Sequence, residues 1–272
     1  MQVRSLTSSD VERVRALLAP RKEAHCFLLS AIERGRLGDM LLVLDPERRE
    51  PVAVCYAGGN CVPSDLDDRS ARTLADALAA QGRRSASIVG RRDDVARLWE
   101  ALHGRWGQPR DVRAEQPLMF LDTAPAIAPD PLVRRVTADE FELLLPAAAA
   151  MFTAEVGVSP LVPGTEAHYR ARIRDSIADG RAFARIENGR IVFKAEIGAV
   201  SAAACQLQGV WVDPEFRGRG LAAPGTAAVA EIAMREFAPA VQLYVNNFNI
   251  AARNAYRRAG FREIDTFRTI FF

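Results

Sequence analysis

The chain has 272 residues, a length that suits one large domain or two domains of ordinary size. Hydrophobic residues make up 49% of it and charged residues 26%, a mixture typical of a soluble globular protein with a sizeable core. The 36 Lys and Arg nearly balance the 34 Asp and Glu, and the formal charge of +2 argues against a general nucleic-acid coat protein.

The first half of the chain predicts alternating helices and strands. Ser8, Ser9 and Asp10 are typical of a helix start, and apolar residues then recur at helical spacing over residues 11–18. After a helix at about residues 24–34, two runs predict a hairpin of strands at residues 40–44 and 52–56. The elements expected to complete this half are a helix at 70–80, a strand at 87–89, a helix at 93–102 and a strand at 117–121.

Residues 122–131, with the sequence DTAPAIAPDP, hold three prolines. Proline cannot donate to a strand ladder and biases the residue before it towards extended geometry. The stretch therefore predicts either a linker or an ordinary surface loop. Taken as a linker, it divides the chain into a domain at residues 1–122, a linker at 123–131 and a domain at 132–272.

The second half predicts a similar order of elements. After a strand at 132–136, Thr137 and Glu140 have the spacing of a capping box, which predicts a helix at 138–152. The expected elements that follow are a helix at 167–178, a hairpin of strands at 181–186 and 191–197, a strand at 205–212, a helix at 221–237, a strand at 241–245, a helix at 250–259 and a strand at 266–272. This alternation predicts an α/β fold around a mixed sheet.

The four cysteines are Cys26, Cys55, Cys61 and Cys205, and none forms a Cys-x-x-Cys pair. Scattered cysteines in a chain of this length are typical of buried free thiols in a reducing compartment. The first residues lack the apolar stretch of a signal peptide, and no apolar run approaches the roughly 20 residues that span a bilayer. We therefore expect a cytoplasmic protein.

Residues 206–225, QLQGVWVDPEFRGRGLAAPG, hold the most informative pattern. A strand leads into a loop of Arg217, Gly218, Arg219 and Gly220, and a helix begins directly after it. Unpaired N–H groups and the helix dipole favour an anion at such a helix start. Glycines let the backbone approach a bulky phosphate, and the arginines add charge-assisted hydrogen bonds. The pattern predicts a diphosphate site.

A dinucleotide fits this loop less well. Gly218, Gly220 and Ala223 satisfy the G-x-G-x-x-A pattern, which is weak evidence alone. The next strand should end in an acidic residue for the ribose, but Asn246 and Asn247 stand there. No Gly-Lys-Ser/Thr follows, which excludes a P-loop.

Two motifs together resemble the GNAT (GCN5-related) N-acetyltransferases. The family's cofactor motif, Arg/Gln-x-x-Gly-x-Gly/Ala, is matched at every fixed position by Arg217, Gly218, Arg219, Gly220, Leu221 and Ala222. The family's later run, Asn-x-x-Ala-x-x-x-Tyr-x-x-x-Gly-Phe, is matched by Asn249, Ala252, Tyr256, Gly260 and Phe261. The resemblance covers roughly residues 132–272. The whole chain looks like the actinobacterial type in which a degenerate GNAT-like domain of unknown function precedes an intact GNAT domain.

The resemblance implies two GNAT-like domains, each with a mixed, mostly antiparallel central sheet flanked by helices. In the C-terminal domain it implies acetyl-CoA between two splayed strands, at 205–212 and 241–245, with backbone groups of Val210 and Val212 bonding the pantetheine arm. Gly209 predicts either a bulge that creates the splay or plain close packing. The remaining contacts that it implies come from residues 217–222, Asn249 and Tyr256.

The resemblance implies Tyr256 as the general acid for the CoA sulfur; the alternative is a packed helix aromatic. Asn249 would cap the last helix, bond the pantetheine arm, or do both. Many relatives carry a glutamate base on the strand before the glycine loop, but this chain has Gln206 and Gln208 there, and neither can take a proton.

Three residues remain as substitutes for that base: Glu196 on the preceding strand, Glu155 in the stretch at 153–164, and His168. For each of them a purely structural or solvated role is the competing interpretation. The stretch at 153–164 is either part of the acceptor site or a connector.

The sequence thus predicts an acetyl-CoA-dependent N-acetyltransferase that moves an acetyl group to a primary amine of a small molecule, peptide or protein lysine, by direct attack in a ternary complex. The alternatives are an acyl-CoA-binding sensor or interaction module with little or no turnover, and a nicotinamide oxidoreductase. We expect no metal, nucleic acid or membrane as partner, and a homodimer is compatible with the sequence. Basic pairs in the first half, such as Arg34 and Arg36, predict a solvated face.

Overall fold

A computed structural model describes residues 1–272. The first half of the chain contains, in order, β1 (Gln2–Ser5), α1 (Val11–Leu18), α2 (Cys26–Glu33), β2 (Met40–Leu44), β3 (Pro51–Ala57), β4 (Cys61–Ser64), α3 (Asp68–Gln81), β5 (Ser87–Arg91), α4 (Arg92–Trp106) and β6 (Asp111–Leu121). The sequence patterns missed the short strands β1 and β4 and found only the last five residues of β6. The other elements of this half confirm the predictions.

The second half repeats the same order: β7 (Val133–Arg135), α5 (Phe141–Val156), α6 (Glu166–Ala178), β8 (Ala182–Glu187), β9 (Arg190–Val200), β10 (Cys205–Val212), α7 (Ala222–Glu236), β11 (Val241–Tyr244), α8 (Ile250–Ala259) and β12 (Arg262–Phe271). Every predicted element is present. The predicted capping box is formed as well, with the Thr137 N–H donating to Glu140 Oε2 at 3.0 Å. Each half therefore reads strand, two helices, three strands, helix, strand, helix, strand.

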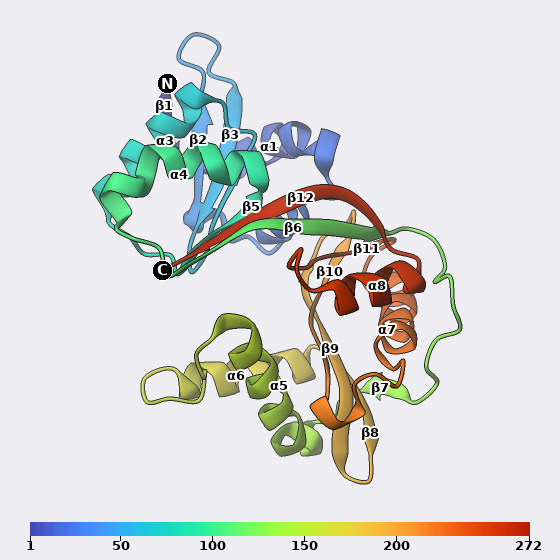
Figure 1. Cartoon of the computed structure of the whole chain (residues 1–272). Helices are drawn as coiled ribbons and strands as arrows, with labels where there is room; N and C mark the ends of the chain where they lie inside the picture. The colour runs from blue at the N-terminus through green and yellow to red at the C-terminus, as the bar shows by residue number, and fades with distance from the viewer.

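All twelve strands form one sheet in the order β1-β2-β3-β4-β5-β12-β6-β11-β10-β9-β8-β7. Only β4–β5 and β10–β11 pair in parallel, so the predicted mixed, mostly antiparallel sheet is confirmed. The last strands of the two halves are exchanged. β12 pairs with β5 of the first half, β6 pairs with β11 of the second, and the two pair with each other. Figure 1 shows β6 and β12 side by side as they run between the two halves.

The exchange is also visible in the cores. Met119 and Leu121 of β6 belong to the core of the second half, which packs against α7 and α8. Ile270 of β12 belongs to the core of the first half, against α3 and α4. The sequence patterns did not predict this, since β6 lies before the proline-rich stretch at residues 123–131 and yet completes the sheet after it.

The proline-rich stretch lies on the surface of the second half. The Ala126 N–H donates to the Ala259 carbonyl at 3.0 Å, and the Asp130 N–H to the Pro224 carbonyl at 3.0 Å. All four cysteines are buried free thiols, as predicted. None of the helices has both the length and the apolar character needed to cross a bilayer.

Candidate active site

The parallel strands β10 and β11 separate soon after they meet. They are paired only at Cys205–Val241 and Gln206–Gln242. Beyond these two pairs, the backbone of β10 has no neighbour on the β11 side. Buried backbone N–H and C=O groups require partners, so this V-shaped opening can accept an extended ligand that carries amides.

A bulge at Gly209 interrupts the pairing of β10 with β9, on the side of β10 away from β11. Gly209 has a φ of +60°, and the pairing of β10 with β9 slips between Gln208 and Trp211. A Cβ at this position would lie 3.1 Å from Met151 Cε and 3.2 Å from Lys194 Nζ. Gly209 forms a bulge against β9 and also allows a close approach. The separation of β10 from β11 begins earlier, after Gln206.

A cavity of about 530 Å³ begins where β10 ends. Its lining includes every residue expected to contact the cofactor except Arg219: Val210, Val212, Arg217, Gly218, Gly220, Leu221, Ala222, Asn249 and Tyr256. The Arg219 guanidinium instead lies over the Phe216 ring, 4.7 Å from its centroid, and donates to the Glu215 carbonyl at 3.0 Å.

Free backbone amides line the entrance to helix α7. None of the N–H groups of residues 218–223 donates to an acceptor in the protein, and the first turn of α7 carries no acidic side chain. Gly218 and Gly220 have φ of +75° and +80°, and no atom would meet a Cβ at either position. These glycines are thus required for the left-handed backbone that turns the amides outward, rather than for space. The result is a concave surface of donors at a positive helix end.

Asn249 and Tyr256 of helix α8 close the cavity on its other side. The Asn249 side chain accepts a hydrogen bond from the Ala252 N–H at 3.2 Å and so caps the helix. The Tyr256 side chain is buried, and its hydroxyl has no hydrogen-bond partner in the protein. Burial, with a smaller contribution from the charge of Glu155, raises the pKa of this phenol well above its ordinary value. Tyr256 is therefore protonated at neutral pH, with its hydroxyl free to donate.

Glu196 lies on β9 directly behind the bulge, where its Oε1 would be 3.5 Å from a Cβ at Gly209. It is almost completely buried and forms ion pairs with Lys194 and, at 3.2 Å, with Arg172. Burial alone would raise the pKa of this carboxyl, but Lys194 and Arg172 outweigh burial and hold it below the ordinary value. Glu196 is thus a fixed anion and a weak base.

The sequence patterns missed Lys194 and Arg172. The run IVFKAEIG at residues 191–198 did contain a signal, because Lys194 and Glu196 stand two residues apart in an apolar strand. Side chains at i and i+2 share one face of a strand, so two opposite charges there predict a buried pair.

The other two candidate bases lie outside the cavities described here. Glu155 is exposed at the end of α5 and lies 3.8 Å from Arg113. His168 is exposed on α6. Neither side chain contributes to the cavity at the end of β10 or to a second cavity between the two halves.

A second cavity, of about 460 Å³, lies between the two halves. Gln206 and Gln208 of β10 line it, whereas Val210 and Val212 of the same strand line the first cavity. β10 therefore runs from one cavity into the other, with the Gly209 bulge at the junction. Because side chains of both halves form its walls, this cavity could not be assigned to the site from the motifs of the second half alone.

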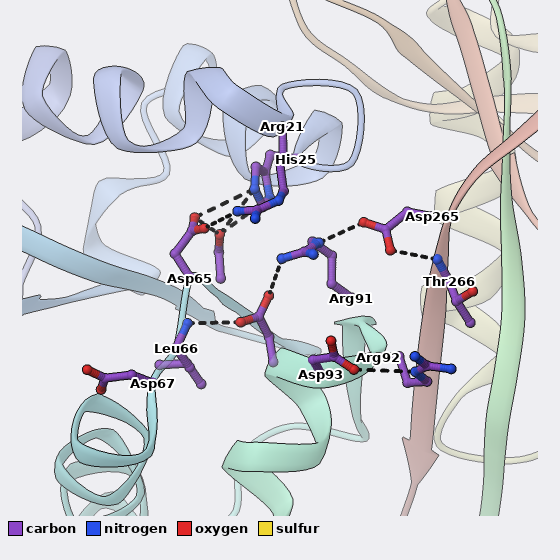
Figure 2. A network of polar contacts seen from close by, with 12 residues as sticks. Arg21, His25, Asp65, Leu66, Asp67, Arg91, Arg92, Asp93, Asp265 and Thr266 are labelled. Carbon is purple, nitrogen blue, oxygen red and sulfur yellow. Dashed lines mark hydrogen bonds and ion pairs between the residues drawn. The ribbon is translucent and has the colours of Figure 1, made fainter.

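The loop of the first half that corresponds in element order to the glycine loop has the opposite charge. It joins β4 to α3 and consists of Asp65, Leu66 and Asp67 (Figure 2). The Asp67 carboxylate caps α3 by accepting from the Ser70 N–H at 2.6 Å. The Leu66 N–H donates to a carboxylate oxygen of Asp94 at 2.9 Å. Carboxylates of the chain itself thus occupy the amides that are free in the second half, which leaves this half without an anion site of the same kind.

A polar network surrounds this acidic loop. Figure 2 shows His25 and Arg21 pointing towards Asp65, and Arg91 pointing towards Asp265 of β12. Burial lowers the pKa of His25 to about 4, although Asp65 at 3.6 Å favours the charged form. The ion pair of Arg91 with Asp265, at 2.7 Å, ties the exchanged strand to the first half.

Comparison with protein families separates the two halves in the same way. Residues 151–261 match the acetyltransferase (GNAT) family, and residues 42–144 match a domain of unknown function, DUF4081. Most of the second half of the chain thus matches the GNAT acetyltransferase family. The GNAT match contains the bulged strand, the glycine loop and helix α8. The DUF4081 match contains the acidic loop and continues into the start of α5.

Solved structures share the fold over nearly the whole chain. A GCN5-related N-acetyltransferase from Sphaerobacter thermophilus has 19% identity and a TM-score of 0.61, over 99% of this chain and 94% of its own. A Drosophila protein has a TM-score of 0.68 at 13% identity, over 99% of this chain and 98% of its own. A tandem GNAT protein from the clavulanic acid biosynthesis pathway has a TM-score of 0.55 at 13% identity, over 98% of both chains. Comparison with curated proteins gave no significant match. At these identities the likeness is one of fold, and it shows that two GNAT-like halves can form one chain.

Proposed function

We propose that the chain binds acetyl-CoA in the cavity at the end of β10 and transfers its acetyl group to a primary amine held in the cavity between the two halves. The observation that carries this proposal is the group of free amides at residues 218–223, at the start of α7. A pyrophosphate would accept hydrogen bonds from them, and Arg217 at the rim adds positive charge. The free edge of β10 would pair with the pantetheine amides, as an added strand does.

The reaction would take place at the Gly209 bulge, where the two cavities meet. The nitrogen lone pair of the amine attacks the thioester carbonyl carbon, and the C–S bond of the tetrahedral intermediate then breaks. Because both reactants would be held in adjoining cavities, the amine could attack the thioester directly in a ternary complex. The nitrogen changes from a neutral amine to a cationic ammonium as its bond to carbon forms.

Two residues would act on the charges that develop. Glu196 stays ionised at neutral pH and would stabilise the developing ammonium, whose proton then passes to water in the polar cavity. Tyr256 would donate a hydrogen bond to the thiolate of CoA as it leaves, and its raised pKa keeps that hydrogen in place until the sulfur becomes negative. Glu155 and His168 have no part in this scheme.

Substitution of one glycine tests the cofactor site. In Gly220→Glu, a carboxylate would stand among the free amides and a side chain would be forced into a backbone with φ of +80°. We expect acetyl-CoA affinity, measured by calorimetry, to fall by at least about tenfold, or roughly 1.4 kcal/mol. Saturating acetyl-CoA should stabilise the parent by about 2.7 kcal/mol at a hundred times its Kd.

Gly189→Glu is a matched control. Gly189 has φ of +71°, no atom would meet its Cβ, and it lies in the β8–β9 turn away from the cavity. The control adds the same charge and a similar backbone strain, so it should bind acetyl-CoA as the parent does. Equal affinity in parent, control and Gly220→Glu would show that the cofactor does not lie on the glycine loop.

A further inference from the structure

The cavity between the halves has a distinct charge pattern. The arginines that line it are Arg34, Arg36, Arg91, Arg172 and Arg181, and the acidic residues are Asp175, Asp179 and Glu196. Arg172 pairs with Glu196, and Arg91 with Asp94 and Asp265. Arg34 and Arg36 form no ion pair or side-chain hydrogen bond, although arginine has five donors to satisfy. Their positive charge in the cavity is therefore open to a ligand.

Arg181 lies on the opposite wall, directly before β8. One of its terminal nitrogens donates to the Gly198 carbonyl at 3.2 Å, but its Nε is buried without a hydrogen-bond partner. Asp179 lies 3.6 Å from Nε, which is beyond hydrogen-bond distance. Burial lowers the pKa of Arg181, and the nearby charge of Arg34 lowers it further. Asp179 offsets this effect only in part, because the pKa of Arg181 stays lowered, and the two cations from different halves repel each other.

The position of Arg34 is fixed by contacts between the halves. Arg34 directly follows α2, and α2 is held to the turn between β9 and β10. Ser30 Oγ accepts from the Val200 N–H at 3.2 Å, and the Glu33 carboxylate accepts from the Ala202 N–H at 3.1 Å. The first half therefore fixes the backbone position from which the exposed Arg34 side chain lines a cavity that opens on β10.

A buried acceptor lies deeper in the same cavity. The Gln242 side chain is 1% exposed, lines the cavity at the last pair of β10 and β11, and leaves its Oε1 without a hydrogen-bond partner. An unsatisfied buried carbonyl oxygen costs about 1–3 kcal/mol. An N–H donor on a ligand would satisfy it, and this donor would lie close to the point where the strands part.

We infer that the acceptor is a small amine with an anionic group, a carboxylate or a phosphate, which Arg34 and Arg181 bind from opposite walls while the amine end points towards Gln242 and the bulge. This inference rests on the proposed acetyl transfer and names the class of its acceptor. A cavity of about 460 Å³ suits a small molecule. The planar fork of arginine matches a carboxylate or phosphate in two-point hydrogen bonding. The first half thus selects the substrate of the GNAT half.

The test compares amines of matched length on the full chain. Glycine, β-alanine and γ-aminobutyrate are the carboxylate series, and aminomethylphosphonate and aminoethylphosphonate are the phosphonate series. Methylamine, ethylamine and propylamine carry only the amine charge, and they are called the neutral series because they lack an anionic group. We expect the best anionic amine to exceed its neutral counterpart in kcat/KM, measured as release of CoA, by about tenfold or more. The carboxylate and phosphonate series distinguish the two kinds of anion.

Two arginine variants locate the effect. In Arg34→Gln and Arg181→Gln we expect the preference for the anionic amine to fall by about tenfold, towards equal rates for the two kinds of amine. Arg48→Gln removes one charge from an exposed position of the same half outside the cavity, and should keep the preference. An equal rate for neutral and anionic amines in the parent, or an unchanged preference in the double variant Arg34→Gln/Arg181→Gln, would overturn the inference.

Calorimetry of the same amines with CoA-saturated protein needs no turnover. Saturable binding of an anionic amine that is lost in the double variant supports the inference, and absence of such binding in the parent overturns it. Acetyl-CoA binding to the same samples is measured separately. Its loss would count against the proposed function, whereas intact acetyl-CoA binding without anion preference would count against the acceptor class alone.

Discussion

Cutting the chain between β6 and β7, to leave residues 132–272, removes the strand that lies between β11 and β12. Leu118, Met119, Phe120 and Leu121 of β6 are each at most 5% exposed. A fully buried apolar side chain contributes about 1.5–3 kcal/mol, so these four contribute roughly 6–12 kcal/mol. This equals the whole stability of a typical domain, about 5–15 kcal/mol. The cut also leaves β12 without either of its neighbours. We expect this fragment not to fold.

A longer fragment provides the comparison. Residues 111–272 retain β6 in its natural order, and with it the β11–β6–β12 pairing. We expect this fragment to unfold cooperatively in thermal circular dichroism and to gain stability from acetyl-CoA. If residues 132–272 unfold cooperatively and respond to acetyl-CoA as the full chain does, the exchanged strand is dispensable and the reasoning is wrong.

Two further predictions concern single side chains. Tyr256→Phe should lower kcat by on the order of 10²-fold and leave acetyl-CoA affinity about the same, since the ring is kept and only a donor is lost; an unchanged kcat would exclude the assigned role. His25→Gln should change how the free energy of unfolding depends on pH between about 6.5 and 4. The folded pKa of His25 is about 4, below the unfolded value of about 6.5, so its stabilising contribution is complete above pH 6.5 and is lost as the pH falls towards 4. Burial raises the pKa of Asp94 to about 6, which has the opposite pH dependence, but Asp94 is present in both proteins and cancels in the difference between them. The stability difference between parent and His25→Gln, from urea unfolding, should therefore change by at most about 3 kcal/mol across this window; parallel curves would contradict the burial argument.

Local patterns were sufficient for most of the fold. Hydrophobic periodicity, the Thr137–Glu140 box and the turn at Asn188 and Gly189 act within a few residues, and the elements they predicted are present. The strand exchange could not be predicted in this way. β6 and β12 are the last strands of two halves with the same element order, and either could pair with β5 or β11. The choice depends on packing between residues more than a hundred positions apart, for which periodicity carries no signal.

The candidate site, like the fold, was predictable where short motifs determine it and not where contacts between distant residues do. The cofactor residues lie in two short motifs, and the structure brings all of them except Arg219 to one cavity. The catalytic assignments were weaker, because the charge state of Glu196 depends on Lys194 and on Arg172 of another element. Arg34 and Arg36 are exposed, in keeping with the predicted solvated face, but the cavity that they line could not be predicted because its other residues come from the second half.

The exchanged strands impose an order on folding during synthesis. A ribosome releases β1 to β5 long before β12, so the sheet of the first half has an open edge at β5 while most of the second half is still being made. β6 is the first strand to emerge that could cover this edge, yet in the finished molecule it lies one place farther away. The nascent chain must therefore either leave β5 bare or give up an early pairing, and the first half reaches its final form only after the second half has been synthesised.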